Sequence, residues 1–126
     1  MPGMDDLLIA RLIAAGRVLF GALCVGAPKL LLRRDAASTP GPAVWMLRAF
    51  GVRDVALGAG TLAALRDDPP DTRWVAVSAA ADSADIATAA AFRDELGVGG
   101  LIATLALAVP AAALGWKSVA GLRSLR

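Results

Sequence analysis

The chain has 126 residues, a formal net charge of +2 and a hydrophobic content of 57%. This length predicts a single domain over residues 1–126, and the hydrophobic content exceeds the roughly 45–50% that is usual for soluble proteins. No basic stripe interleaved with aromatic residues is present, which excludes a nucleic-acid-binding protein. Histidine is absent and cysteine occurs once. We therefore expect no metal site, no intrachain disulfide and no cofactor with the usual protein ligands.

The first apolar segment covers about residues 7–32 and follows the acidic start Met-Pro-Gly-Met-Asp-Asp. A secretory signal begins with a basic region and ends at a small-residue cleavage site, so we expect this segment to remain as a membrane span. A span needs about 20 mainly apolar residues, with a range of about 17–25. Arg11 lies near one end of this segment and Arg17 lies within it.

The next two segments are separated by clear turn and loop signals. Residues 43–65 follow the turn sequence Ser-Thr-Pro-Gly-Pro at 38–42, and the charged loop 66–71 with its two prolines ends them. Residues 72–92 form the third segment, in which alanine dominates and Asp82 and Asp85 are internal. The third segment is therefore the weakest of the predicted spans by hydropathy.

The fourth segment, residues 98–120, follows a glycine-rich link and contains no charged residue from Val98 to Trp116. The three tryptophans fall at predicted span ends, where their rings prefer the headgroup level: Trp45, Trp74 and Trp116. A soluble four-helix bundle would need polar outer faces with a period of 3.6 residues, which the fourth segment lacks. The sequence thus predicts an all-α fold, a four-transmembrane-helix bundle with the lipid bilayer as its partner.

Four spans place both chain termini on one side of the membrane. The basic residues on that side are Arg11, Arg66, Arg73, Lys117, Arg123 and Arg126, and those on the other side are Lys29, Arg33, Arg34 and Arg93. The excess on the terminal side predicts cytoplasmic termini by the positive-inside rule.

Ionisable residues in three of the segments lie at about the same depth. By the span boundaries, they fall within about one helical turn, or about 5 Å, of the span centres: Arg17, Arg53, Asp54, Asp82 and Asp85. A charge in lipid is costly, so such residues are a functional-site hypothesis by default. Arg48 lies about one and a half turns from Asp54 and would make this layer neutral. Ser78 joins Asp82 and Asp85 on one helix stripe at i, i+4 and i+7.

Two interpretations of this layer remain open. In the structural one, Arg–Asp pairs fix the register and the partners of the spans. In the functional one, the layer binds a small molecule or an ion, with arginine offering a fork to an anion and aspartate carrying a proton. The candidate ligand- or ion-binding residues are Arg17, Arg48, Arg53, Asp54, Ser78, Asp82 and Asp85.

The sequence Arg48-Ala-Phe-Gly-Val-Arg-Asp-Val-Ala-Leu-Gly58, with the pattern R-x-x-G-x-R-D-x-x-x-G, resembles that of small four-span proteins of the DoxX-like type. Asp82-Ser-Ala-Asp85 is similar to their acidic third span. The resemblance implies a compact four-helix bundle in a bacterial inner membrane and brings no catalytic assignment. It marks Arg48, Gly51, Arg53, Asp54, Gly58, Asp82 and Asp85. DoxX-like proteins are linked to redox and quinone-related membrane systems, but this chain shows no cofactor ligand.

These observations lead to three hypotheses of function. The first is an accessory or scaffolding subunit that packs against a larger membrane complex or a second copy of itself. The alternative is a small-molecule or ion-binding transport bundle, proton-coupled through the same layer. The third, an enzyme acting on a lipid-soluble substrate, ranks below both because Ser78 and Ser83 have no histidine or lysine nearby to activate them.

Overall fold

The structure, a computed structural model, describes residues 2–32 and 41–125. In these ranges the chain is entirely helical apart from its connections, with α1 (Pro2–Gly26), α2 (Pro28–Leu32), α3 (Gly41–Ala64), α4 (Arg73–Ala91) and α5 (Arg93–Arg123). The all-α prediction is confirmed. Most of the turn predicted at 38–42, and Arg33, Arg34 and Arg126 of the charge count, lie outside the described residues.

Proline divides the first predicted span. Pro28 has no amide hydrogen to continue the helical ladder, and its ring disfavours helical geometry at the preceding residue, Ala27. Consequently α1 ends at Gly26, and Pro28 begins the short α2 at a position that suits proline. At its other end α1 begins at Pro2, earlier than the predicted residue 7.

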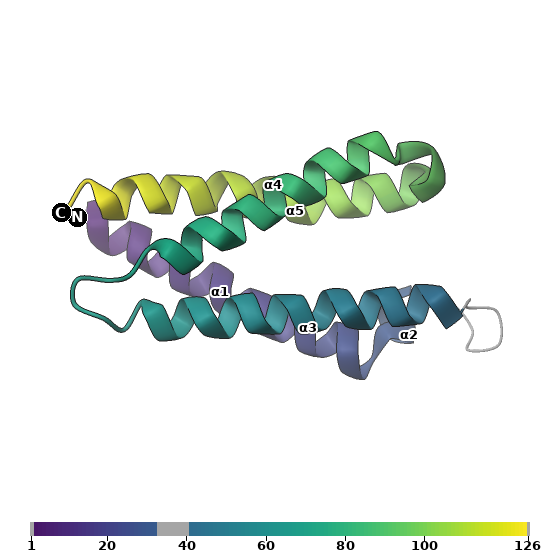
Figure 1. The fold of residues 1–126 in the computed structure, drawn as a ribbon, viewed down its shortest axis with the longest axis horizontal. Helices are drawn as coiled ribbons and strands as arrows, with labels where there is room; N and C mark the ends of the chain where they lie inside the picture. Colours follow the sequence, from purple (N-terminus) through teal and green to yellow (C-terminus); the bar gives the residue numbers. More distant parts are fainter. Residues whose placement is uncertain (1, 33–40, 126) are drawn as a thin grey trace.

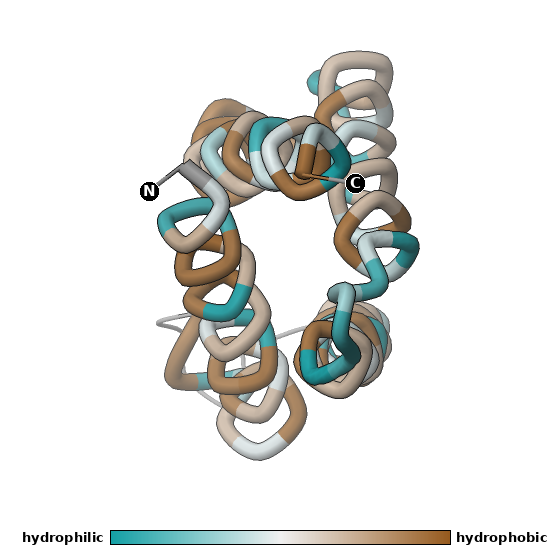
Figure 2. The backbone as a smooth tube through the Cα atoms, turned by 90° about the vertical axis from the view of Figure 1, so that its left-hand side faces the viewer, coloured by the Kyte–Doolittle hydropathy of each residue, from teal (hydrophilic) through white to brown (hydrophobic). Residues whose placement is uncertain are grey.

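The four long helices form an elongated bundle with the N- and C-termini at the same end (Figure 1). Helix α1 packs along α3 and also against α5, while α4 packs along α5 and touches α3 less extensively. Seen along the bundle, α1, α3, α4 and α5 lie around a common axis (Figure 2). Three of these helices therefore surround the side chains that α1 directs inward.

Glycines let α1 and α3 approach until backbone touches backbone. A Cβ atom added at Gly58 would lie 2.6 Å from the carbonyl oxygen of Ala14, and one added at Gly51 would lie 2.6 Å from that of Gly21. Gly21 reciprocally faces Gly51 at the same distance. Gly51 and Gly58 thus form a close-contact seam of α3 against α1, and this seam brings the charged residues of the two helices into reach of each other.

Helix α5 is interrupted once, at Gly97. Its φ of 71° lies in the left-handed region that favours glycine. After this interruption α5 continues from Val98, the predicted start of the fourth segment, to Arg123, three residues past the predicted end at residue 120.

Trp116 lies inside this helix. Its indole Nε1 donates a hydrogen bond to Ser83 Oγ at 3.1 Å.

The apolar core lies towards the end of the bundle that carries the termini. It contains the buried residues Ala10, Leu65, Val75, Val119 and Leu122, drawn from α1, α4 and α5 and from the residue after α3. Many large apolar side chains instead face outwards, and four of them mark the outer side of α1: Leu8, Leu12, Leu19 and Leu23.

Two helical segments of the described chain, Gly3–Gly26 and Arg93–Arg123, are long and apolar enough to cross a membrane. A core helix of a soluble protein or a signal sequence can have the same length and composition, so length and composition alone are weak evidence for a membrane location. Helices α3 and α4 are not among these two segments: α3 carries Arg48, Arg53 and Asp54 along its length, and α4 carries Asp82 and Asp85.

Candidate functional site

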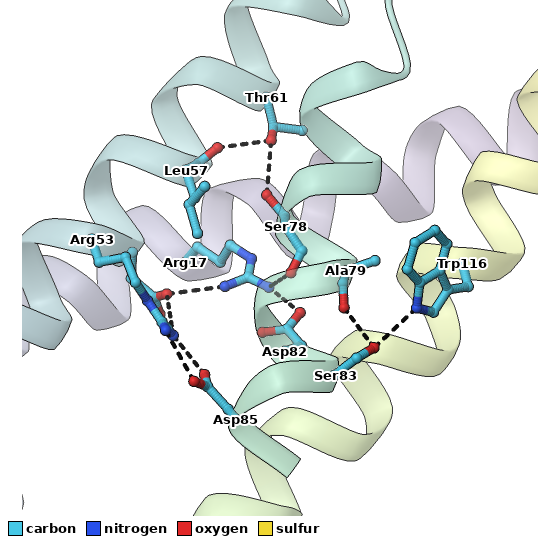
Figure 3. A network of polar contacts seen from close by, with 11 residues as sticks. Arg17, Arg53, Leu57, Thr61, Ser78, Ala79, Asp82, Ser83, Asp85 and Trp116 are labelled. Atoms are coloured by element: carbon cyan, nitrogen blue, oxygen red, sulfur yellow. Dashed lines mark hydrogen bonds and ion pairs between the residues drawn. The ribbon is translucent and has the colours of Figure 1, made fainter. Parts of the chain in front are cut away.

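Arg17 is the centre of a buried ionic site and joins three helices. Its Nη1 donates to Asp54 Oδ1 on α3 at 2.9 Å, and its Nη2 donates to Asp82 Oδ2 on α4 (Figure 3). Nη2 also lies 3.3 Å from the carbonyl oxygen of Ser78. The side chains of all three charged residues are almost fully buried, with 6–7% exposed. We call Asp54, Arg17 and Asp82 the triad.

A second ion pair flanks the triad. Arg53 binds Asp85 with both terminal nitrogens, Nη1 to Oδ1 at 3.0 Å and Nη2 to Oδ2 at 2.6 Å. This two-pronged geometry matches the planar fork of arginine to a carboxylate. The Arg53 guanidinium also lies 4.6 Å from the centre of the Phe50 ring. Arg53 Nη2 is 3.9 Å from Asp54 Oδ1, which links this pair to the triad.

Two hydroxyl groups extend the site towards the termini. Thr61 Oγ1 donates to the carbonyl oxygen of Leu57 at 2.7 Å and lies 3.4 Å from Ser78 Oγ. Both residues line a small pocket together with Arg17 and Asp82. The volume within this pocket that the centre of a water molecule can occupy is about 10 Å³. This is close to the minimum that holds one water molecule. Nε of Arg17 is buried and has no hydrogen-bond partner among the described residues.

Arg48 does not join this layer. It is exposed, and its Nε donates to the carbonyl oxygen of Val25 at 3.3 Å. The expectation that Arg48 balances the charge of the layer is therefore not met. Helix geometry gives the reason: five residues separate Arg48 from Arg53, so the two side chains leave α3 about 140° apart.

The structure brings the other six candidate residues together. Asp82 contacts Arg17, Ser78 contributes its carbonyl oxygen to Arg17 and its hydroxyl to Thr61, and Asp85 pairs with Arg53. The predicted stripe of α4 does face inwards, with Ser78 and Asp82 buried and Asp85 half-buried. This stripe faces both α1 and α3, because Arg17 of α1 binds Asp82 and Arg53 of α3 binds Asp85.

Thr61 and Phe50 were not predicted as members of the site. Thr61 follows Asp54 by seven residues, two turns along the same face, and it is the only polar residue of α3 after Asp54, so this spacing was a usable signal. Phe50 precedes Arg53 by three residues, a separation at which side chains on a helix meet. Both residues support charged groups of the layer, Phe50 by stacking and Thr61 through Ser78.

The arrangement can hold three helices in register, and the pocket beside it has room for about one water molecule. Comparisons with known protein families, with characterised proteins and with solved structures give no match to this chain.

Proposed function

We propose that the chain is an integral membrane protein whose four long helices cross a bilayer, and that it serves as an accessory or scaffolding subunit of a membrane complex or homo-oligomer. In this proposal the Arg–Asp layer fixes the register of α1, α3 and α4 near the middle of the membrane. The localisation that goes with it is a bacterial inner membrane with both termini in the cytoplasm, as the DoxX-like resemblance and the distribution of lysine and arginine imply.

The observation that carries the proposal is the reversed distribution of polarity. Leu12 and Leu19 on α1 are 62% and 69% exposed, whereas Arg17 between them is 7% exposed. In a water-soluble bundle the charged side chains face out and the leucines face in. Large exposed apolar surfaces mark contact with a membrane or with another protein. If hydrocarbon surrounds the bundle, the exposed leucines contact lipid, and the charged side chains are expected to pair in the interior.

Helices α3 and α4 fit the same placement despite their charges. With a rise of 1.5 Å per residue, the 24 residues of α3 and the 19 of α4 extend about 36 Å and 28 Å, against a hydrocarbon thickness of about 30 Å. Asp54 and Asp82 are bound by Arg17, and Asp85 by Arg53. Charged residues within spans characteristically face the bundle interior and pair with one another.

The scaffolding role is supported by how the arginines are used. The terminal nitrogens of Arg17 and Arg53 bind aspartates of neighbouring helices. Such contacts fix the register of the helices. On the outer surface, Cβ atoms added at Gly16 or Gly99 would meet nothing within 4 Å. Small residues at lipid-facing positions allow another helix to approach closely, so these two positions are where a second copy or a partner subunit would pack.

Native mass spectrometry from detergent micelles tests this role, because it reports copy number, partners and retained ligand together. We expect an assembly that is weakened by Gly16→Leu or Gly99→Leu, with helical content unchanged. Val52→Leu, at an exposed position of α3, is the matched control and should leave the assembly intact. A wild-type chain that is monomeric under the mildest extraction, or an assembly that tolerates both glycine variants, would contradict the scaffolding role.

The alternative, a bundle that binds an ion or a small molecule, is favoured by one observation. The lining of the small pocket includes four polar residues, Arg17, Thr61, Ser78 and Asp82, and Nε of this arginine has no hydrogen-bond partner among the described residues. Under this alternative, Asp82→Asn folds and assembles normally but loses a pH or ligand response. Under the scaffolding role, the same variant changes assembly or stability first.

A further inference from the structure

The ionic layer carries an unbalanced charge. It contains two arginines, Arg17 and Arg53, and three aspartates, Asp54, Asp82 and Asp85. With every group ionised its net charge is −1. Arg48 lies outside on the carbonyl oxygen of Val25, and among the residues that the structure describes no third arginine binds these aspartates.

The surplus is located in the triad. Arg53 and Asp85 bind each other through two hydrogen bonds, so this pair is neutral by itself. Arg17 is the one cation that Asp54 and Asp82 share, and the side chains of these aspartates are only 6% exposed. Arg53 Nη2 also lies 3.9 Å from Asp54 Oδ1, but the two shorter bonds of Arg53 go to Asp85. An ionised carboxylate that is buried without a full counter-charge is strongly disfavoured. The triad therefore requires one more positive charge.

We infer that the triad holds one exchangeable proton, shared between Asp54 and Asp82 across Arg17. The fork of Arg17 occupies one oxygen of each carboxylate, Oδ1 of Asp54 and Oδ2 of Asp82, which leaves the second oxygen of each to carry the proton. No group of three or more metal-ligating side chains is present among the described residues, so the structure favours a proton over a metal cation. This inference rests on the proposed placement of the triad in a membrane.

The pocket has room for a water molecule that could exchange this proton. Its lining includes Arg17, Thr61, Ser78 and Asp82, whose side chains are drawn in Figure 3. The step balances when the donor is a hydronium ion: one of its O–H bonds breaks, an O–H bond forms on a carboxylate oxygen, and a neutral water molecule remains. The reverse step returns the proton to water.

The groups that face the triad come from three helices. They are Cys24 on α1, Arg53 on α3 and Asp85 on α4. Cys24 is fully buried. From α5, the neighbouring polar contact is Trp116 on Ser83, which is uncharged.

Infrared spectroscopy of the protein in detergent or lipid tests the inference, because a protonated carboxyl group has its own C=O stretching band that shifts in D₂O. At neutral pH we expect this band in the wild-type protein. It should vanish in both D54N and D82N, since each variant leaves one aspartate with one arginine and no need of a proton. D6N is the control and should keep the band, because Asp6 is buried beside Gly121 and lies outside the ionic layer.

A second readout uses stability against pH. The native triad holds a proton that the aspartates of the unfolded chain have released above about pH 4, so thermal stability should fall as the pH rises. D54N and D82N should flatten this dependence, and if one of them fails to fold the other still decides. A wild-type protein without the band, or a band that survives in both variants, overturns the inference. Stabilisation by sodium in place of the band would also overturn it. A chain that stays soluble without detergent would instead overturn the membrane placement.

Discussion

Arg17 is the residue at which α1, α3 and α4 meet through ionic contacts. Two buried aspartates bind its single positive charge. Its removal leaves Asp82 without that counter-ion and Asp54 with only Arg53, whose Nη2 lies 3.9 Å away. A buried ion pair is not by itself strong evidence for stability, since apolar residues of similar volume often serve as well. Removal of one partner alone strongly destabilises the fold, because the remaining charges stay buried without compensation.

Arg17→Gln should therefore lower the free energy of unfolding by about 3–5 kcal/mol, the range for breaking a buried ion pair. SDS titration in mixed micelles, followed by tryptophan fluorescence, measures this change. Arg48→Gln is the matched control, because Arg48 is exposed and binds only a backbone carbonyl. Its effect should stay within about 0.5 kcal/mol. Equal effects of the two variants would show that Arg17 does not hold the helices together.

Asp54→Asn should cost much less than Arg17→Gln. Its amide oxygen can still accept from Arg17 Nη1, and Arg17 then forms a neutral pair with Asp82. We expect a loss of about 1 kcal/mol, the scale of one weakened hydrogen bond, in the same unfolding titration. A loss as large as that of Arg17→Gln would mean that both carboxylates are needed in ionised form.

At the scale of single residues, the sequence predicted the depth of the charged residues in the bundle better than the direction in which their side chains leave the helix. Arg17, Arg53, Asp54, Asp82 and Asp85 were expected at one level, and they contact one another there. Arg48 lies near that level too, but its angle around α3 takes it outside. The pairing within the layer was beyond the sequence, because it depends on how three helices are rotated about their axes.

At the scale of elements, the contact of α1 with α3 depends on glycines. Gly58 faces the backbone of α1, where a Cβ atom would meet the carbonyl oxygen of Ala14 at 2.6 Å and Cγ2 of Val18 at 2.8 Å. A backbone oxygen cannot rotate away as a side chain can. The two helices must therefore separate to admit even one methyl group, and Arg17 then loses reach to Asp54.

Gly58→Ala should destabilise the bundle by about 1–3 kcal/mol, as overpacking does in other well-packed cores. Gly16→Ala on α1 serves as the control, since a Cβ atom there has no neighbour within 4 Å. It should cause no loss, because alanine is the better helix former. Thermal unfolding of the two variants side by side measures the difference. A Gly58→Ala protein as stable as the Gly16→Ala protein would refute the close-contact seam.

The helices themselves were largely predictable, because turn residues and apolar runs determine their bounds. The segments predicted at 43–65 and 72–92 match α3 and α4 within about two residues. The division of the first segment at Pro28 was not anticipated, although proline carries that signal. The predicted fourth segment, residues 98–120, ends three residues before α5 does at Arg123. The hydrogen bond of Trp116 to Ser83 was not predicted.

At the scale of the whole molecule, both termini lie at one end of the bundle, and a side chain at Gly3 would touch Leu125. If all four long helices cross the membrane, the two ends of the chain occupy the same compartment. Reporter fusions at either end, one active only in the cytoplasm and one only outside it, should both indicate the cytoplasm. Opposite locations for the two ends would contradict an even number of spans.

The central claim is that hydrocarbon covers the apolar outside of the bundle at the level of the ionic layer. Leu19 tests it most directly, because it is 69% exposed and only two residues from Arg17. A spin label on Leu19→Cys, in a Cys24→Ser background and reconstituted in lipid vesicles, reports which relaxing agent reaches that face. We predict strong relaxation by dissolved oxygen, which concentrates in lipid, and little by a water-soluble nickel complex. The opposite ranking would place this face in water and contradict the account.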